Sequence, residues 1–372
     1  MTPISRPYEA PWDGPRRRRV SWSPSVTLVP TRSCFNSCGY CSFRRTADPA
    51  NPLADALGNY QARALLASRP TAAEVLLLSG EVAPAAPQRR AWVRLLLDLC
   101  RLAWSQGRLP HTNAGPLSLQ EMAALARLNG SMGLMLEGLG PAYDALHAHA
   151  PSKRPELRLA QLVQAGRLGI PFTTGLLLGV GESNADRRAA LELLAQLQRR
   201  WGHIQEVILQ PFRPDGCQTQ RLTLAEQADL LGTIEAARAI LPPEVHLQMP
   251  PNLWPLEALP AALEAGIDDL GGLDCTDVIN PAYPQPSEAL LAAVLGRAGF
   301  ELVPRLCVHG AWLRFLPAGL QLQARRVGAR LLASRPRGPL AADLREHHKQ
   351  PSGAAGAAAL QSHLPDRADL SG

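Results

Sequence analysis

Short apolar runs alternate with longer amphipathic segments along most of this chain. Runs rich in Val, Leu and Ile between turn residues predict buried strands. The longer segments carry apolar residues three or four positions apart, as Leu191, Leu194 and Leu197 do, which predicts helices. The expected strands are 26–29, 75–78, 110–113, 132–136, 172–178, 205–209, 246–249 and 269–270. The expected helices are 52–66, 86–104, 119–128, 156–168, 185–201, 224–240, 255–265 and 287–299.

This succession of strand-then-helix units predicts an α/β fold built on a parallel sheet with helices outside it. Right-handed crossovers close such units naturally into a (β/α)8-type barrel, which typically needs about 250 residues. Residues 23–300 match that length. Two alternatives stay open on the pattern alone. One is an open doubly wound sheet, and the other is a partial six-stranded barrel with the last two units appended.

The barrel pattern divides the chain into three parts. Residues 1–22 are rich in Pro and Arg and predict an irregular basic lead-in. Residues 23–317 are assigned to the barrel domain, and a weak alternation at 300–315 predicts an added strand or lid. Residues 318–372 shift to Ala, Gly, Arg, Pro and Ser. They predict a low-complexity, mostly disordered tail with a fraying helix at 320–332.

Composition narrows the class of protein. With 372 residues, 46% of them hydrophobic, the chain can bury a substantial core. It has no apolar run of about 18 residues and no apolar signal core near Met1, so we expect a cytoplasmic protein without a membrane contact. The net charge of +6 is concentrated in the arginine run at 16–19 and in arginines near the C-terminus. Because these clusters lack interleaved aromatic residues, we expect solvated tails and no nucleic-acid interface.

Candidate chemistry gathers in one loop directly after the first expected strand. Cys34, Cys38 and Cys41 have C-x3-C-x2-C spacing, and no fourth Cys or His follows within the loop. A structural zinc site or a fully protein-ligated iron–sulfur cluster needs four protein ligands. Three thiolates instead suit a cubane cluster with one iron open to a small molecule. The other four of the seven cysteines are scattered and are assigned structural roles.

The cysteine spacing, with Tyr40 before the third cysteine, resembles the signature of the radical S-adenosylmethionine (SAM) enzymes. The resemblance implies a TIM-type (β/α)8 barrel, complete or partial, with a 4Fe–4S cluster on the three cysteines and SAM on the open iron. The turn at 79–81 resembles the Gly-Gly-Glu turn of these enzymes, with Ser in place of the first Gly, and 175–182 resembles their G-x-I-x-G-x-x-E stretch. The residues that the resemblance assigns to SAM are Tyr40, Ser79, Gly80, Glu81, Asn113, Glu137, Arg158 and Gly179.

Polar residues near the ends of later strands are candidates for substrate contact, since the functional side chains of such barrels gather there. Glu137, Gln210 and His149 are the catalytic candidates, and Asn252 is a further candidate contact with the substrate. His147 and His149 together also admit zinc, but no third ligand is evident nearby. Structural histidines and turns made by the neighbouring prolines are the alternative interpretations of these positions.

Longer stretches narrow the resemblance to one family, 7,8-didemethyl-8-hydroxy-5-deazariboflavin (FO) synthase. Within it they resemble the subunit that closes the deazaflavin ring, in a form like the cyanobacterial one. The stretches are 78–81, 110–113, 131–137, 149–153, 171–182, 206–211 and 250–252, within a resemblance that covers 22–315. The family implies that a 5′-deoxyadenosyl radical converts a hydroxybenzyl–ribitylaminouracil adduct to the deazaflavin, with loss of ammonia. It also implies a separate radical SAM subunit that supplies the adduct, and an electron donor such as flavodoxin or ferredoxin.

Other functions stay open on the sequence alone. The chain is alternatively the partner subunit that transfers the hydroxybenzyl group, or a radical SAM relative from the menaquinone pathway. Turnover of the preformed adduct, compared with turnover of tyrosine plus the pyrimidine, separates these enzymes. A further alternative is a metal-dependent nucleic-acid-binding protein that uses its basic termini. That alternative predicts tight, salt-sensitive DNA or RNA binding that survives in a Cys34→Ala variant.

Overall fold

Eight parallel strands close into a barrel in the part of the chain that the computed structural model describes, residues 18–333 without 49, 52 and 214–219. In order they are β1 (Arg18–Leu28), β4 (Glu74–Leu78), β5 (Leu109–Asn113), β6 (Ser131–Gly133), β7 (Phe172–Leu178), β8 (Ile204–Pro211), β9 (His246–Gln248) and β10 (Asp269–Leu273). β1 closes the barrel because it pairs with β4 and also with β10. The predicted barrel is confirmed, and the open sheet and the partial barrel are excluded.

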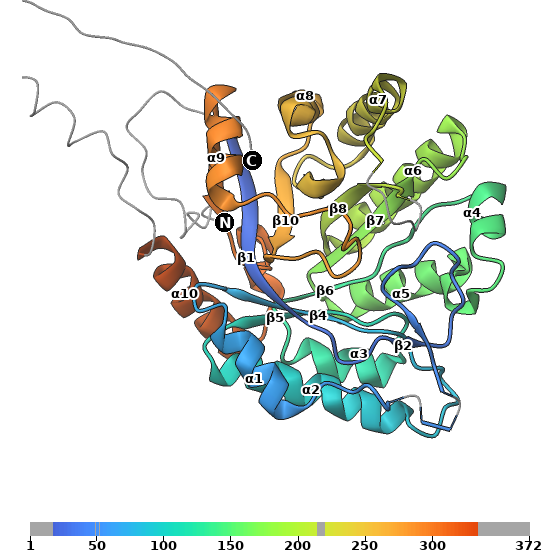
Figure 1. Ribbon diagram of the computed structural model, residues 1–372, viewed down its shortest axis with the longest axis vertical. Coiled ribbons are helices and arrows are strands. Elements are labelled where there is room, and N and C mark those ends of the chain that lie inside the picture. The colour runs from blue at the N-terminus through green and yellow to red at the C-terminus, as the bar shows by residue number, and fades with distance from the viewer. Residues whose placement is uncertain (1–17, 49, 52, 214–219, 334–372) are drawn as a thin grey trace, which may run out of the picture. The chain divides into compact units, whose positions relative to one another are not determined.

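Helices cover the outside of the barrel (Figure 1). The helices that the pattern predicts are α1 (Asn59–Ala67), α2 (Arg89–Ser105), α3 (Leu119–Ala126), α5 (Pro155–Leu168), α6 (Asn184–Trp201), α7 (Leu224–Ile240), α8 (Leu259–Ala265) and α9 (Glu288–Arg297). The pattern does not predict α4 (Pro141–Leu146) or the 3-10 turns η1 (Pro151–Lys153) and η2 (Pro251–Leu253), and the start of the helix predicted at 255–265 is the 3-10 turn η3 (Leu256–Ala258). In the described ranges, no helix is both long and apolar enough to cross a membrane.

Local sequence explains where several of these elements lie. Ser118, Ser183 and Thr223 begin α3, α6 and α7, because each accepts a hydrogen bond from the backbone N–H three residues later. β7 is buried along its whole length, as expected for a barrel strand with neighbours on both sides and helices outside. Gly175 in β7 lets β8 approach, since a Cβ there would lie 2.4 Å from the carbonyl oxygen of Ile208.

The predicted irregular lead-in extends too far into the chain. Residues 18–22 belong to β1, where they pair in parallel with β11 (Phe300–Pro304). β11 is the strand that the weak alternation after residue 300 predicts. The arginines at 18 and 19 hide the strand from pattern analysis, because the pairing that stabilises it is made with a segment almost three hundred residues later. Residues 1–17 of the predicted lead-in lie outside the described part of the chain.

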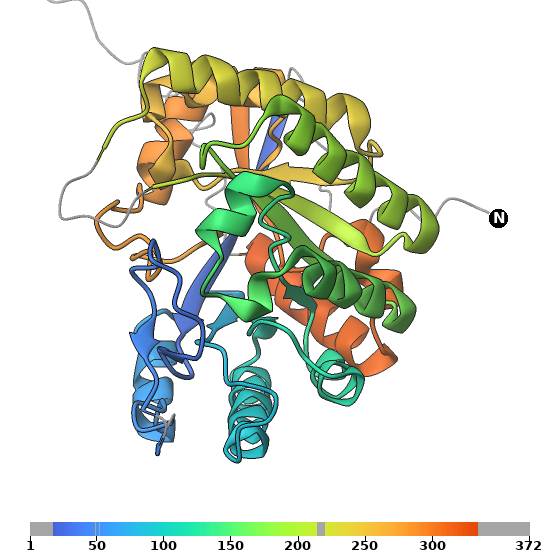
Figure 2. The same cartoon turned by 90° about the vertical axis from the view of Figure 1, so that its right-hand side faces the viewer.

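The helix expected at 320–332 is present, but it packs against the barrel domain, so the predicted disordered tail begins too early. Residues Ala318–Ala333 form the helix α10, which follows the 3-10 segment η4 (Gly310–Phe315). Leu320, Ala324, Val327 and Leu331 of α10 are buried in a small core with Leu109 at the start of β5. Seen from two directions, α10 and the loop that carries the three cysteines lie on opposite sides of the barrel (Figures 1 and 2). The remainder of the predicted tail, 334–372, lies outside the described residues.

Candidate active site at the mouth of the barrel

The three cysteines lie on the loop between β1 and α1, residues 29–58, which we call the cysteine loop. Asp55 ties the start of this loop together, because its carboxylate accepts hydrogen bonds from the Thr31 hydroxyl, from the backbone N–H of Arg32 at 2.9 Å and from the Ser33 hydroxyl at 3.1 Å. The short strand β2 (Ser33–Cys34) pairs with β3 (Arg45–Thr46). These bonds fold the loop back on itself and bring the cysteines to one side of the barrel mouth.

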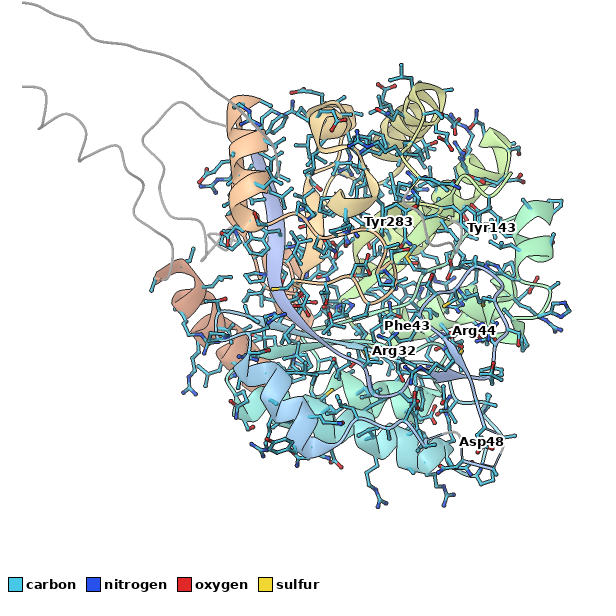
Figure 3. The ribbon with its side chains drawn as sticks, viewed as in Figure 1. Arg32, Phe43, Arg44, Asp48, Tyr143 and Tyr283 are labelled. Carbon is cyan, nitrogen blue, oxygen red and sulfur yellow. The ribbon has the colours of Figure 1, made fainter. Side chains whose placement is uncertain are left out.

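Arg32 and Arg44 hold the middle of the cysteine loop (Figure 3). The Arg32 guanidinium lies over the Phe43 ring, 4.9 Å from the ring centroid, and donates a hydrogen bond to the Phe43 carbonyl at 3.2 Å. Arg44 Nε donates to the carbonyl oxygen of Cys38 at 3.0 Å. Both arginines therefore satisfy carbonyl groups of the loop that no regular secondary structure pairs.

The thiols of Cys34, Cys38 and Cys41 fit a ligand larger than one metal ion. Cys38 is buried, Cys34 and Cys41 are partly exposed, and none of the three forms a disulfide. Thiolates around a single zinc ion lie roughly 4 Å apart. Among the described residues, these three sulfur atoms do not form a group whose members all lie within 4.8 Å of one another. The donor set of three thiolates, spaced in this way, fits an iron–sulfur cluster with one open iron.

Burial affects the chemistry of these thiols. Removal from water raises the pKa of the Cys38 thiol to about 11 and also raises the pKa of Cys34. Thiolates are the ligand form, so metal binding at these cysteines must release protons.

The turn after β4 is hydrogen-bonded to the cysteine loop. Gly80 donates its backbone N–H to the Thr31 carbonyl at 2.7 Å, and Phe35 donates to the Glu81 carbonyl at 3.0 Å. A Cβ on Gly80 would lie 2.2 Å from the carbonyl oxygen of Ser33, so only glycine fits this approach. The Ser79 hydroxyl points away from the mouth, toward α2, because it accepts a hydrogen bond from the Trp92 indole at 2.9 Å.

Glu81 and Arg158 form a buried ion pair beside the cysteines. Arg158 Nη2 lies 3.2 Å from Glu81 Oε1, and the Arg158 side chain is 3% exposed. Arg158 also donates to the Ser152 carbonyl at 2.9 Å, while Asn36 Nδ2 donates to Glu81 Oε2 at 3.0 Å and to the Ser152 hydroxyl at 2.8 Å. These four residues link the cysteine loop, β4, η1 and α5 into one network. Asn36 and Ser152 were not among the predicted site residues.

Glu137 lies just beyond β6 in a strained backbone conformation. Its φ of 74° makes it the one non-glycine residue of the described chain in the left-handed region. Its backbone pairs with β7 nevertheless, because its N–H donates to the Gly175 carbonyl at 3.0 Å and its carbonyl accepts from Leu177 at 2.7 Å. Strain of this kind concentrates at functional sites. The conformation turns the Glu137 side chain toward η1.

Lys153 of η1 connects Glu137 to the cysteine loop. Its ammonium pairs with the Glu137 carboxylate and donates to the Tyr40 oxygen at 2.9 Å. Burial raises the pKa of the Glu137 carboxyl, but Lys153 and Arg158 outweigh that effect and the pKa lies below its usual range. Lys153 is not among the predicted site residues. The sequence signal for it is its position four residues after His149, in a segment rich in ionisable groups.

His147 completes this chain of contacts. Its Nε2 lies 3.0 Å from the Tyr40 oxygen, and burial lowers its pKa to about 4, so the ring is neutral. Tyr40 accepts from Lys153, so its own proton points to His147 Nε2, which must be the unprotonated nitrogen. The predicted candidate His149 is different: its side chain is exposed, and only its backbone carbonyl contacts the site, by accepting from the Ser37 N–H at 2.8 Å. The buried histidine of this segment is His147.

A cavity of about 190 Å³ runs from the mouth into the barrel, and we call it the barrel cavity. Asn113 at the end of β5 and Gln210 near the end of β8 line its upper part, and both are predicted site residues. Glu74, Thr173 and Glu206 line its deeper part. The cavity is lined from every barrel strand and from the segment after β10.

Two other predicted residues lie beside the barrel cavity without lining it. Asn252 donates to Asp277 Oδ2 at 2.9 Å and to the Tyr283 carbonyl at 3.0 Å, so it holds down the segment after β10. Gly179 has a φ of 92° and begins a turn in which its N–H donates to the Glu182 carboxylate at 2.8 Å. Both residues shape the rim of the mouth, and Tyr283 is labelled there in Figure 3.

Arg305, which follows β11, closes the barrel below the cavity. Its guanidinium donates to Asp269 at 2.6 Å and to Glu206 at 2.9 Å. Glu206, Asp269 and His309 are the group of metal-type ligands that lie within 4.8 Å of one another in the described part of the chain. Because the guanidinium already pairs with both carboxylates, this group is a buried ion-pair network and needs no cation.

Sequence comparison finds relatives along nearly their whole length. The chain is 48% identical over 312 residues to the 7,8-didemethyl-8-hydroxy-5-deazariboflavin synthase of Thermosynechococcus vestitus. The alignment covers 83% of this chain and 98% of that protein. It is 50% identical over 297 residues to the protein of the same name from Gloeobacter violaceus. That alignment covers 79% of this chain and 91% of that protein. A scan against models of protein families found no match.

Comparison with solved structures agrees on the fold. The FeFe-hydrogenase maturase HydG from Carboxydothermus hydrogenoformans aligns with a TM-score of 0.58 at 18% identity, over 86% of this chain and 79% of that chain. Methylornithine synthase (PylB) aligns with a TM-score of 0.57 at 13% identity, over 79% of this chain and 85% of that chain. At such identities the likeness concerns the barrel fold alone.

Proposed function

This chain belongs to the 7,8-didemethyl-8-hydroxy-5-deazariboflavin synthase family, and we propose that it is the subunit that closes the deazaflavin ring. It is an enzyme of deazaflavin biosynthesis with the radical SAM barrel fold. The observation that carries the proposal is the position of a three-cysteine loop at the mouth of a barrel whose cavity presents polar side chains from several strands.

In this proposal Cys34, Cys38 and Cys41 hold a 4Fe–4S cluster and leave one iron for SAM. When bound and reduced, the cluster supplies the electron that cleaves SAM to methionine and a 5′-deoxyadenosyl radical. The fit rests on the three thiols without a fourth ligand in their loop. The residues assigned to SAM are Tyr40, Ser79, Gly80, Glu81, Asn113, Glu137, Arg158 and Gly179.

Several of the residues assigned to SAM already have partners within the protein, and these contacts narrow the role of each. Glu81 and Arg158 already neutralise each other, so we assign them the task of fixing the cysteine loop and the turn after β4. Ser79 and Gly80 present backbone groups, because the Ser79 hydroxyl is bonded to Trp92. Tyr40 stands between the second and third cysteines with its ring fixed by Lys153 and His147, which suits packing against the adenine.

The proposed substrate is 5-amino-5-(4-hydroxybenzyl)-6-(D-ribitylimino)-5,6-dihydrouracil. Together with SAM it gives the deazaflavin, 5′-deoxyadenosine, methionine and an ammonium ion. The substrate is uncharged and rich in hydrogen-bond donors and acceptors, so amide side chains suit it better than an arginine clamp. Asn113 and Gln210 supply such groups where the barrel cavity meets the mouth. We assign substrate contact to Gln210 and give the exposed His149 side chain no such role.

Two partners follow from this chemistry. Formation of the adduct is assigned to a separate radical SAM subunit that joins the hydroxybenzyl group of tyrosine to 5-amino-6-ribitylaminouracil. An electron donor such as flavodoxin or ferredoxin is assigned to reducing the cluster before SAM is cleaved, and the substrate radical gives one electron back when the ring closes, so the overall equation consumes no external electron.

The experiment that tests this assignment offers the reconstituted protein two substrate mixtures. One contains the preformed adduct, and the other contains tyrosine with 5-amino-6-ribitylaminouracil, each with SAM and reductant under anaerobic conditions. We expect deazaflavin only from the preformed adduct, measured by mass spectrometry. Formation of the adduct from the second mixture would assign the chain to the partner reaction instead.

A further inference from the structure

The barrel cavity continues well below the mouth. Gln210 lines it near the end of β8, and Glu206 lines it four residues earlier. Four residues of strand correspond to about 13 Å. Glu74, the first residue of β4, lines the same deep part. The space below the mouth therefore has room for an extended part of a ligand whose reacting part lies near the cysteine loop.

His111 presents an acceptor to this deep part. Its Nδ1 lies 2.6 Å from the Ser131 hydroxyl, and that hydroxyl donates its own proton to the Cys307 carbonyl at 2.7 Å. His111 must therefore donate from Nδ1, which leaves Nε2 as the unprotonated nitrogen. Burial lowers the pKa of His111 to about 3, consistent with a neutral ring. A Cβ on Gly133, which lines the cavity, would lie 2.9 Å from Nε2, so the glycine leaves this acceptor uncovered.

Glu74 presents a second acceptor. It is 4% exposed, and among the described residues its carboxylate has no ion pair within 4.0 Å and has the Ser23 hydroxyl as a hydrogen-bonding neighbour. Burial raises its pKa, while Arg305 and the Ser23 hydroxyl act in the opposite direction. Gly272 leaves it open to the cavity, since a Cβ there would lie 3.2 Å from Glu74 Oε1. A carboxyl group offers about four acceptor sites, so one hydroxyl neighbour leaves Glu74 free to accept hydrogen bonds from a ligand in the cavity.

Two donors at the bottom of the cavity are already used. Arg305 donates to Asp269, Glu206 and the Leu306 carbonyl, and Thr173 donates to Glu206 Oε2 at 3.0 Å. The hydrogen-bonding groups left for a ligand are the acceptors of Glu74 and His111 and the side-chain amide of Gln248, which also lines the cavity. Uracil and phenol edges offer both donors and acceptors, whereas a polyhydroxylated chain offers a hydroxyl donor at each carbon.

We propose that the bottom of the barrel cavity binds the ribityl chain of the substrate, with Glu74 and His111 accepting hydrogen bonds from its hydroxyl groups. This inference rests on the proposed function, because that function supplies the ribityl-bearing substrate. The arrangement places the uracil and the phenol above the chain, between Asn113 and Gln210 at the mouth. It makes Glu74 the residue that selects for the hydroxylated chain.

The test compares two ligands on the full-length protein. One is 7,8-didemethyl-8-hydroxy-5-deazariboflavin, and the other is the same ring system with an ethyl group in place of ribityl. Equilibrium dialysis measures both dissociation constants for the wild type, Glu74→Leu, Glu74→Gln and the control Glu235→Leu, an exposed position on α7. Binding needs no turnover, so the readout is independent of the activity of the loaded enzyme.

We expect the wild type and Glu235→Leu to bind the ribityl compound at least tenfold more tightly than the ethyl compound, a difference of about 1.4 kcal/mol. Glu74→Leu should lose this preference, because only the ribityl compound should bind it more weakly. Glu74→Gln keeps an acceptor oxygen and the fold, so it should lose only part of the preference. Equal weakening of both ligands, an unchanged preference in both variants, or no preference in the wild type overturns the inference. If the wild type makes no deazaflavin from the adduct, the proposed function fails instead, which the turnover assay shows separately.

Discussion

Lys153 Nζ lies 2.9 Å from the phenol oxygen of Tyr40, so a cation of η1 holds an aromatic residue that stands between two of the cysteines. The same ammonium pairs with Glu137, whose backbone is strained. The two contacts couple the conformation of the cysteine loop to the end of β6.

Replacing Lys153 with Met should destabilise the protein. The Glu137 side chain is only 9% exposed, so its carboxylate would lose its nearest compensating charge in a buried position. Breaking a buried pair from one side typically costs about 3–5 kcal/mol. Denaturant unfolding of the apoprotein measures this loss. The double variant Glu137→Gln/Lys153→Met should recover much of it, and a double variant as unstable as the sum of the single variants would contradict the pairing.

Replacing Gly80 with Ala should displace the cysteine loop. The added Cβ would lie 2.2 Å from the carbonyl oxygen of Ser33, next to Cys34, so backbone must move. We expect a loss of about 1–3 kcal/mol in the free energy of unfolding and several-fold less iron per chain after anaerobic reconstitution. Gly232→Ala is the matched control, because its Cβ on α7 meets nothing within 4 Å. Wild-type iron content in Gly80→Ala would show that the loop tolerates the displacement.

Stability should fall as the pH drops below neutrality, in part because of His203. Burial lowers its pKa in the folded chain to about 4, whereas the unfolded chain takes up the proton near pH 6.5. Between these values the unfolded state binds more protons. The stabilisation is therefore complete above about pH 6.5 and is lost toward pH 4, with a slope approaching 1.4 kcal/mol per pH unit.

Denaturant unfolding of the apoprotein at several pH values between 6.5 and 4 measures this slope. His203→Leu removes the titrating group, so the slope for this variant should be smaller by about one proton. Identical slopes for the wild type and His203→Leu would mean that His203 binds a proton equally well in both states.

Replacing Gln210 with Ala should weaken binding of the substrate more than binding of SAM. The Gln210 side chain lines the barrel cavity near the end of β8, whereas the residues assigned to SAM include Tyr40 of the cysteine loop. Loss of one neutral hydrogen bond corresponds to about a tenfold rise in KM for the adduct. Gln210→Ala is assayed beside Gln196→Ala, a change at an exposed position on α6. Unchanged kinetics with the adduct, or an equal loss in both variants, would remove Gln210 from the site.

The barrel could be predicted from the sequence because apolar periodicity records which side of each element faces the core. β7 illustrates this, since its continuous apolar run is buried along its whole length. The first residues of β1 could not be predicted, because their partner is β11 at the other end of the barrel domain. The apolar residues Leu320, Val327 and Leu331 do predict the helix α10, but the Ala, Gly and Arg around them do not indicate that this helix packs against β5.

The residues of the site also divide into those that the sequence predicts and those that it does not. The spacing of Cys34, Cys38 and Cys41 is local, so the sequence predicts the centre of the site directly. The choice between His147 and His149 depends on the end of α4, where His147 turns inward to Tyr40 and His149 turns outward to solvent. No pattern over so short a segment distinguishes them.

Only a weak signal in the sequence marks the hydrogen-bond acceptors of the barrel cavity. Glu74 and Glu206 are acidic residues in otherwise apolar strands, at inward-facing positions. A charge in such a run indicates a buried network or a ligand site. Distinguishing between the two required the position of Arg305, which pairs with Glu206 but forms no ion pair with Glu74 within 4.0 Å among the described residues.

The most direct test of the central claim is the ratio of two products. The protein is reconstituted anaerobically with iron and sulfide and incubated with reductant, SAM and the preformed adduct, and deazaflavin and 5′-deoxyadenosine are both quantified. We predict that the two products form in equal amounts, and that neither forms when Cys34, Cys38 and Cys41 are all replaced by Ser. Formation of 5′-deoxyadenosine without deazaflavin would contradict the account.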